Sequence, residues 1–127
     1  MKLIHPILFS ALAATALSAA PTLRLSETTI GPVSIVAGQN GPTRSIDFTN
    51  IGDGTLNITL RSSATWAVAT TGSARPCSAL GGVCTPINVA LNTASLARGT
   101  YTATITVSDP NALDAPQTIS EIGRAHV

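Results

Sequence analysis

The sequence predicts an all-β protein in which two antiparallel sheets pack as a sandwich, and three observations point to that class. Residues 100–107 alternate strictly between apolar side chains, from Tyr101 to Val107, and threonines, as a half-buried strand does. Similar short segments recur about every 8 to 12 residues, separated by Gly, Pro, Asn and Ser. Branched apolar residues and Thr are abundant and Lys is nearly absent, a composition that favours strands over helices.

The chain begins with a segment typical of a secretory signal peptide, residues 1–20. Lys2 gives a short positive end, residues 3–17 are mostly apolar, and small residues close the run, which favours cleavage after Ser18. A membrane anchor is the alternative, but the run is shorter than the roughly 20 residues that span a bilayer. We therefore expect a helical leader and an exported protein, which is secreted, periplasmic or at the cell surface.

Residues 21–120 are long enough for one domain and contain the candidate strands. Residues 45–49 and 55–61 flank a turn at residues 50–54, so they are predicted to form a hairpin. A further strand begins at Gln117 and is predicted to pair with residues 100–107. The other candidate strands are residues 22–26, 33–37, 65–69 and 87–91, with Gly31-Pro32 and residues 38–42 as breaks.

About seven strands in roughly 100 residues are typical of an immunoglobulin-like sandwich, with a small closed barrel as the alternative. The apolar faces of the strands should meet between the two sheets, and the threonines should face water. The expected core consists of Ile46, Phe48, Leu56, Ile58, Leu60, Trp66, Val89, Leu91, Tyr101, Ile105 and Val107.

The last seven residues, 121–127, break the alternation that begins at Gln117. Their sequence, Glu-Ile-Gly-Arg-Ala-His-Val, resembles the conceptual translation of a common sequencing-library adapter. We expect residues 121–127 to be an artefactual tail, the last strand to be cut short after Ser120, and the natural protein to continue with a different sequence. A genuine polar tail is the alternative.

Between leader and tail the chain has no histidine and no lysine, and its five arginines balance five acidic residues. No basic field is present to hold nucleic acid or an anionic membrane. Nucleophilic catalysis of the Ser-His-Asp or Ser-Lys type lacks its base, and the four aspartates are placed in or beside turns, where they cap the backbone. We expect no enzyme, no catalytic residues, no metal site and no cofactor, although Asp109, Asn111 and Asp114 could offer oxygens to calcium.

Cys77 and Cys84 form an even pair in a chain that is expected to be exported, and such a pair is expected to be a disulfide. Closing so short a loop contributes about 2.5 kcal/mol on the chain-entropy estimate. Free thiols and a metal site are the alternatives, but two thiols without a nearby histidine are too few ligands for a metal.

Three segments occur in an order that resembles the BACON family of bacterial immunoglobulin-like domains (Bacteroidetes-associated carbohydrate-binding, often N-terminal). They are Asn50-x-Gly52-x-Gly54-Thr55-Leu56, Ser62-Ser63-Ala64-Thr65-Trp66, and residues 96–107 with their Gly-Thr-Tyr start. The resemblance covers residues from about Ile35 to Ser120, and the cysteine pair departs from the family pattern. It implies a sandwich that belongs to a multidomain extracellular or periplasmic protein, often beside enzymes or other sandwiches.

Two functions are compatible with these features. The first is a non-catalytic structural, spacer or interaction module of a larger bacterial surface or secreted protein, whose partners are the neighbouring domains. The alternative, implied by the family name, is a carbohydrate-binding module with polysaccharide as its partner. Sugar sites use exposed aromatic platforms, and of Phe48, Trp66 and Tyr101 only Trp66 follows a polar stretch, so Trp66 is the candidate ligand-binding residue.

Overall fold

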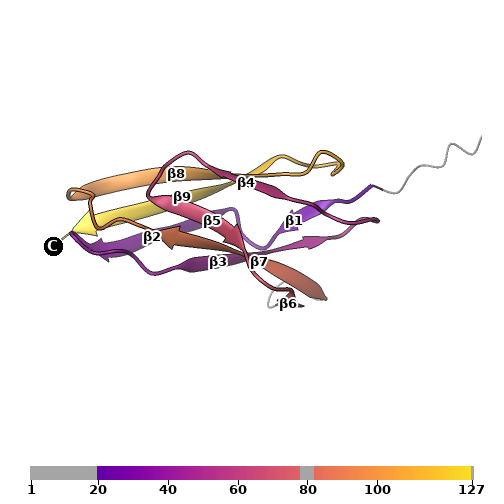
Figure 1. Ribbon diagram of the computed structural model, residues 1–127, viewed down its shortest axis with the longest axis horizontal. Helices are drawn as coiled ribbons and strands as arrows, with labels where there is room; N and C mark the ends of the chain where they lie inside the picture. The colour runs from indigo at the N-terminus through magenta and orange to yellow at the C-terminus, as the bar shows by residue number, and fades with distance from the viewer. Residues whose placement is uncertain (1–19, 78–81, 127) are drawn as a thin grey trace, which may run out of the picture.

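The computed structural model describes residues 20–77 and 82–126, which form two β-sheets packed face to face (Figure 1). One sheet has five strands in the order β1-β3-β7-β5, with β6 paired to β7, and the other has four strands in the order β2-β9-β8-β4. No helix occurs among the described residues, and the expected leader lies outside them except for Ala20. The strands are β1 (Leu23–Leu25), β2 (Thr29–Val36), β3 (Arg44–Asn50), β4 (Thr59–Ser62), β5 (Ala67–Thr71), β6 (Arg75–Pro76), β7 (Val83–Leu91), β8 (Gly99–Ser108) and β9 (Gln117–His126).

Strand β8 confirms the alternation from which the fold class was predicted. Ala103, Ile105 and Val107 are buried, whereas Tyr101, at the start of the strand, is partly buried. The strand pairs antiparallel with β9, and Val107 lies opposite Gln117, so the predicted partner is confirmed.

The predicted hairpin between residues 45–49 and 55–61 is wrong, because the two segments lie in different sheets. Strand β3 pairs with β1 and β7, whereas β4 starts only at Thr59 and pairs with β8. The side chain of Asn50 explains the crossing: its Oδ1 accepts hydrogen bonds from the backbone N–H groups of Thr22 and Gly52, and its Nδ2 donates to the Gly54 carbonyl. The turn is therefore anchored to the first strand and not folded back onto β3.

The expected break at Gly31-Pro32 lies inside β2, where the register with β9 shifts between Ile30 and Val33. Gly31 has a φ of 101°, and a Cβ there would collide with the carbonyl oxygen of Ile122 on β9. The glycine thus allows a bulge within a strand that pairs parallel to its neighbour.

Strand β9 does not stop at Ser120 but continues to His126, paired with β8 on one side and β2 on the other. Residues 20–77 and 82–126 contain nine strands where about seven were expected. The additional elements are short or irregular: β1 has three residues and β6 has two, too few for an alternation to be visible in the sequence.

The core lies between the two sheets, and about half of the expected core residues are fully inside it. Leu56, Ile58 and Leu60 are only partly buried, because β4 is an edge strand and residues 55–58 precede it, and Trp66 and Tyr101 are partly buried as well. Other buried apolar side chains were not among the expected core residues. The buried residues are Ile46, Phe48, Val89, Leu91, Ile105 and Val107, as expected, together with Leu23, Ile30, Val33, Ile35, Ala67, Ile87, Ala103 and Ile119.

Candidate functional site

Trp66 is the residue on which the carbohydrate-binding hypothesis depends, and it immediately precedes β5. Its side chain is partly buried against the core. The indole meets the ring of Tyr101 edge to face, with ring centroids 6.2 Å apart and an interplanar angle of 67°. A Cβ at Gly123 of β9 would lie 4.0 Å from the indole Cζ3, so the indole packs within ordinary van der Waals distance of that position.

A shallow hollow of about 350 Å³ lies beside Trp66 on the β4–β5 side of the sandwich. Residues on both sides of Trp66 in the sequence line it, and the indole does not. The lining consists of Leu60, Ser62, Ser63, Ala64, Thr65, Ala67, Val68 and Ala69. The hollow thus has small polar and apolar walls without an aromatic platform.

Tyr101, the neighbour of Trp66, uses its hydroxyl to hold the loop before β8. The hydroxyl donates a hydrogen bond to the carbonyl of Ala97, at 2.7 Å. Gly99 lies under the ring, since a Cβ at that position would be 3.7 Å from the Tyr101 Cε2, and its φ of 154° disfavours other residues. The Gly-Thr-Tyr segment therefore fixes the conformation of the loop that leads into β8.

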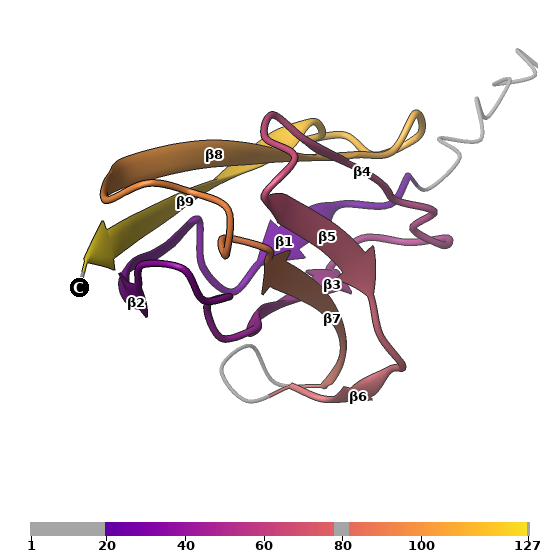
Figure 2. The same cartoon turned by 60° about the vertical axis from the view of Figure 1, so that its left-hand side comes forward.

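The predicted disulfide between Cys77 and Cys84 is confirmed. It joins the two sides of the β6–β7 hairpin, which projects from the sandwich (Figure 2). On the same hairpin Arg75 forms an ion pair with Asp47 of β3, at 2.9 Å. Asp47 is 3% exposed and lies within a strand, so its expected position in or beside a turn is wrong.

Asp109 and Asp114 use their carboxylates to fix the backbone. Asp109 accepts hydrogen bonds from the N–H groups of Asn111 and Asn57, and these bonds hold the pKa of its carboxyl below the ordinary value. Asp114 accepts bonds from the N–H of Leu23 and from Gln117 Nε2. Both residues serve the capping role that the sequence predicted, and within the described residues no three His, Cys, Asp or Glu side chains are grouped as a metal site would require.

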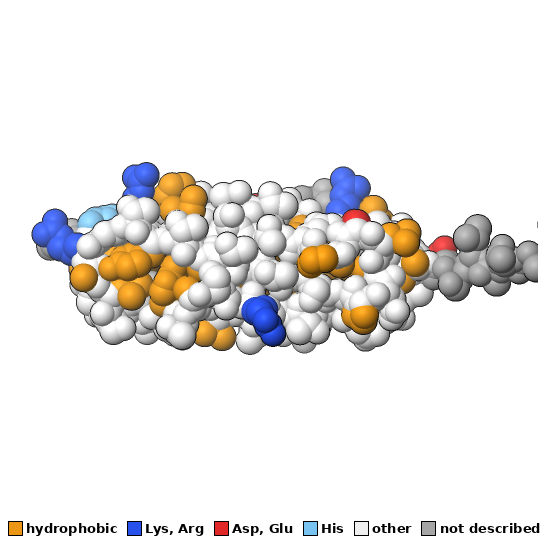
Figure 3. All heavy atoms as spheres, turned by 90° about the horizontal axis from the view of Figure 1, so that it is seen from above, with side chains coloured by type: hydrophobic (Ala, Val, Ile, Leu, Met, Phe, Trp, Pro, Cys, Tyr) orange, Lys and Arg blue, Asp and Glu red, His pale blue; other side chains and the backbone are white. Residues whose placement is uncertain are grey.

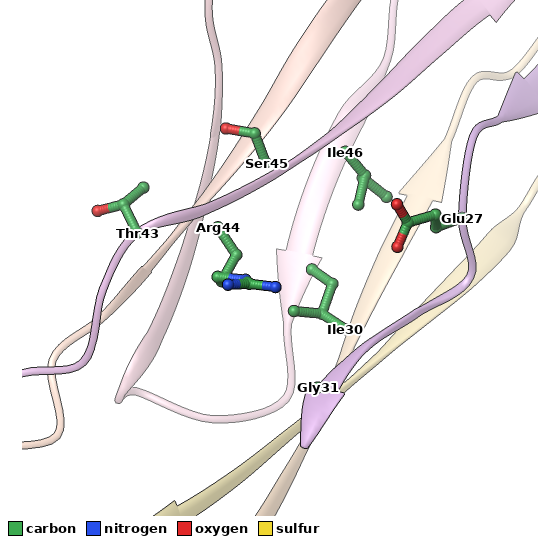
Figure 4. A pocket seen from close by; sticks show the side chains of 7 residues that line it. All are labelled: Glu27, Ile30, Gly31, Thr43, Arg44, Ser45 and Ile46. Atoms are coloured by element: carbon green, nitrogen blue, oxygen red, sulfur yellow. The ribbon is translucent and has the colours of Figure 1, made fainter. Parts of the chain in front are cut away.

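A second hollow, of about 300 Å³, lies at the open edge of the sandwich between β2 and β3 and is named here the β2–β3 mouth. Figure 4 shows Glu27, Ile30, Arg44 and Ile46 pointing into it, whereas the hydroxyls of Thr43 and Ser45 point away. Ile30, one of the residues that line the mouth, lies opposite Glu121 of β9 in the sheet. Glu121 is fully buried, and no sequence pattern predicts a carboxyl inside the core at this position.

The surface offers no extended charged region on the face shown in Figure 3. Basic side chains are isolated there, acidic ones are few, and apolar side chains form small separate groups. In the described part of the chain, no helix has the length and apolar character needed to cross a membrane.

No family model matches the chain, and no curated protein matches it.

Proposed function

We propose that this chain is a non-catalytic immunoglobulin-like module, of the BACON type, that serves as a spacer or interaction domain in a larger extracellular or surface protein. The observation that carries the proposal is the course of the chain. It enters the described part at Ala20, at one end of the long axis, and leaves at His126, at the opposite end (Figure 1). A domain joined beyond the end of β9 would be held a full module length away from the start of the sandwich.

The strand order supports the immunoglobulin-like assignment. Constant-type immunoglobulin sandwiches place strands A, B, E and D in one sheet and C, F and G in the other. When the strands are lettered along the chain, the order across one sheet, β1-β3-β7-β5, matches A-B-E-D, and the order across the other, β4-β8-β9, matches C-F-G, with β2 added beside β9. The short β6 is the extra element between the strands equivalent to D and E.

Tyr101 gives independent support for the same assignment. Many immunoglobulin-like sandwiches carry a tyrosine near the start of strand F, and its hydroxyl bonds to the backbone a few residues upstream. Tyr101 lies near the start of β8, the equivalent of F, and bonds to Ala97 four residues upstream. The Gly-Thr-Tyr segment that carries the family resemblance therefore has a structural role that a spacer needs.

The proposal is tested by exchanging the module in the full-length protein. Replacing it with an unrelated sandwich of equal end-to-end length should preserve the activity of the attached domains and the overall dimensions measured by small-angle scattering. Deleting the module should shorten the particle. If the exchanged protein keeps its dimensions but loses a binding activity, the spacer function is wrong.

The alternative to a spacer function is carbohydrate binding. Trp66 is the only tryptophan in the sequence, so the tryptophan fluorescence of the protein reports on this residue alone. Packed against Tyr101 and the core, it should give blue-shifted fluorescence that a panel of polysaccharides leaves unchanged. Retardation in polysaccharide affinity gels that is lost in Trp66→Ala, but retained in Tyr101→Phe, would instead establish a sugar site. Tyr101→Phe is the matched control, because it loosens the same corner and keeps both rings.

A further inference from the structure

Glu121 occupies a position on β9 that faces the core. Ile119 precedes it and Gly123 follows it on the same buried face of the strand. Its neighbours on the adjoining strands are Ile30 of β2 and Ala103 of β8, and both are buried. With 0% of the residue exposed, a carboxyl group lies where the surrounding pattern calls for an aliphatic side chain.

The carboxyl group of Glu121 lacks the polar contacts that a buried acid normally has in the part of the chain that the structure describes. Neither of its oxygens has a hydrogen-bond partner among residues 20–77 and 82–126. Ile30 and Ala103 bring no charge, and the one cation that acts on it is Arg44 of β3, which lies at the β2–β3 mouth and does not hydrogen-bond to it. Glu27 lines the same mouth and is exposed to solvent (Figure 4).

We infer that position 121 is a core position that this sandwich is built to fill with an apolar side chain, and that Glu121 keeps the end of β9 docked only while its carboxyl is protonated. An unpaired carboxylate in an apolar site is far more costly than the neutral acid, so the charged form favours opening of the strand. Opening begins on the β2 side, because β2 is an edge strand that pairs with β9 alone, so the end of β9 loses its β2 partner first.

The direction of the pH effect follows from burial. Desolvation raises the pKa of Glu121 from 4.5 to about 7, and Arg44 opposes the rise only in part. A carboxyl that holds its proton more tightly when folded stabilises the fold fully below pH 4.5 and loses that contribution as the pH rises through 7. The folded-to-unfolded ratio should fall by roughly two orders of magnitude across this range.

The environment of Glu121 agrees with the expectation that residues 121–127 come from an adapter. Native cores pair buried carboxyls or exclude them. The first residue of the suspected tail is the one buried carboxyl without a hydrogen-bond partner in the described chain. A lone acid in the core is what foreign sequence would leave in a strand position that the rest of the domain shapes for an apolar residue.

The experiment measures urea unfolding and amide exchange of β9 between about pH 5 and 8, where a group with a raised pKa changes the stability. It compares the full chain with Glu121→Leu and Glu121→Gln, with Glu27→Gln as the matched control for an exposed carboxyl at the same mouth. Both histidines, His5 and His126, are replaced by Asn in every variant, because histidine changes charge in this range.

Glu121→Leu should be more stable than the parent at pH 8 by roughly a hundredfold in the folded-to-unfolded ratio, and Glu121→Gln should remove the pH dependence. The Glu27→Gln control should keep the parent's pH profile. If Glu121→Leu lowers stability, position 121 is not an apolar core site. If Glu121→Gln keeps the parent's profile, the carboxyl does not control the docking of β9.

Discussion

At the scale of single residues, buried carboxyls show how the same chemistry is accommodated in different ways. Asp109 is surrounded by backbone N–H groups, Asp47 is paired with Arg75, and Glu121 has no hydrogen-bond partner in the described chain. Hydrogen bonds and cations favour the charged form, whereas burial alone favours the neutral one. Asp109 and Glu121 therefore impose opposite pH dependences on the same fold.

The substitution Asp109→Asn tests the pH dependence of stability that Asp109 is expected to cause at acid pH. The pKa of Asp109 is lowered by the N–H groups of Asn111 and Asn57, so its stabilising effect is present above the ordinary value of 3.8 and is lost as the pH falls below it. The variant should be less stable at neutral pH and should lose less stability between about pH 5 and 3. The midpoints of urea unfolding at each pH measure this change in stability, and Asp53→Asn, a substitution at an exposed residue, is the control. If Asp109→Asn loses as much stability as the parent between about pH 5 and 3, the prediction is wrong.

At the scale of elements, the β6–β7 hairpin is closed by the Cys77–Cys84 bond and is held to β3 by the Arg75–Asp47 pair. Replacing both cysteines by serine should lower the free energy of unfolding by about 2.5 kcal/mol, because the unfolded chain regains the freedom of the short loop. Chemical denaturation with and without a reductant measures the loss. The double serine variant should not respond to the reductant, and a parent chain that ignores it as well would show that the bond contributes nothing.

The elements that the sequence predicted well are those specified by their own residues. Strand β8 has a strict alternation, and its partner β9 follows it closely along the chain. The predicted hairpin failed because Asn50 bonds to Thr22, 28 residues away, which no local pattern reveals. The same reason applies to Asp47 and Arg75, which are 28 residues apart.

At the scale of the whole molecule, the fold requires a strand in the place of residues 121–126, whatever their origin. Strand β2 contacts the rest of its sheet through β9 alone, and five of its six paired positions face residues after Ser120. Without those residues, β2 has almost no partner, so its role could not be predicted from residues 21–120 alone. The same reason applies to the core role of Ile30, Val33 and Ile35, the buried side chains of β2.

A chain that ends after Ser120 should therefore fail to fold cooperatively. Each large apolar side chain that loses its cover costs about 1.5–3 kcal/mol, and β2 carries three of them. Together they approach the total stability of an ordinary domain, about 5–15 kcal/mol. Far-ultraviolet circular dichroism and thermal unfolding should show no cooperative transition in the truncated chain. The full-length Glu121→Val chain, which restores an aliphatic residue between Ile30 and Ala103, should melt above the parent at pH 8, because it covers β2 without burying a charge. A truncated chain that melts at the parent's temperature would show that β2 holds its place without β9.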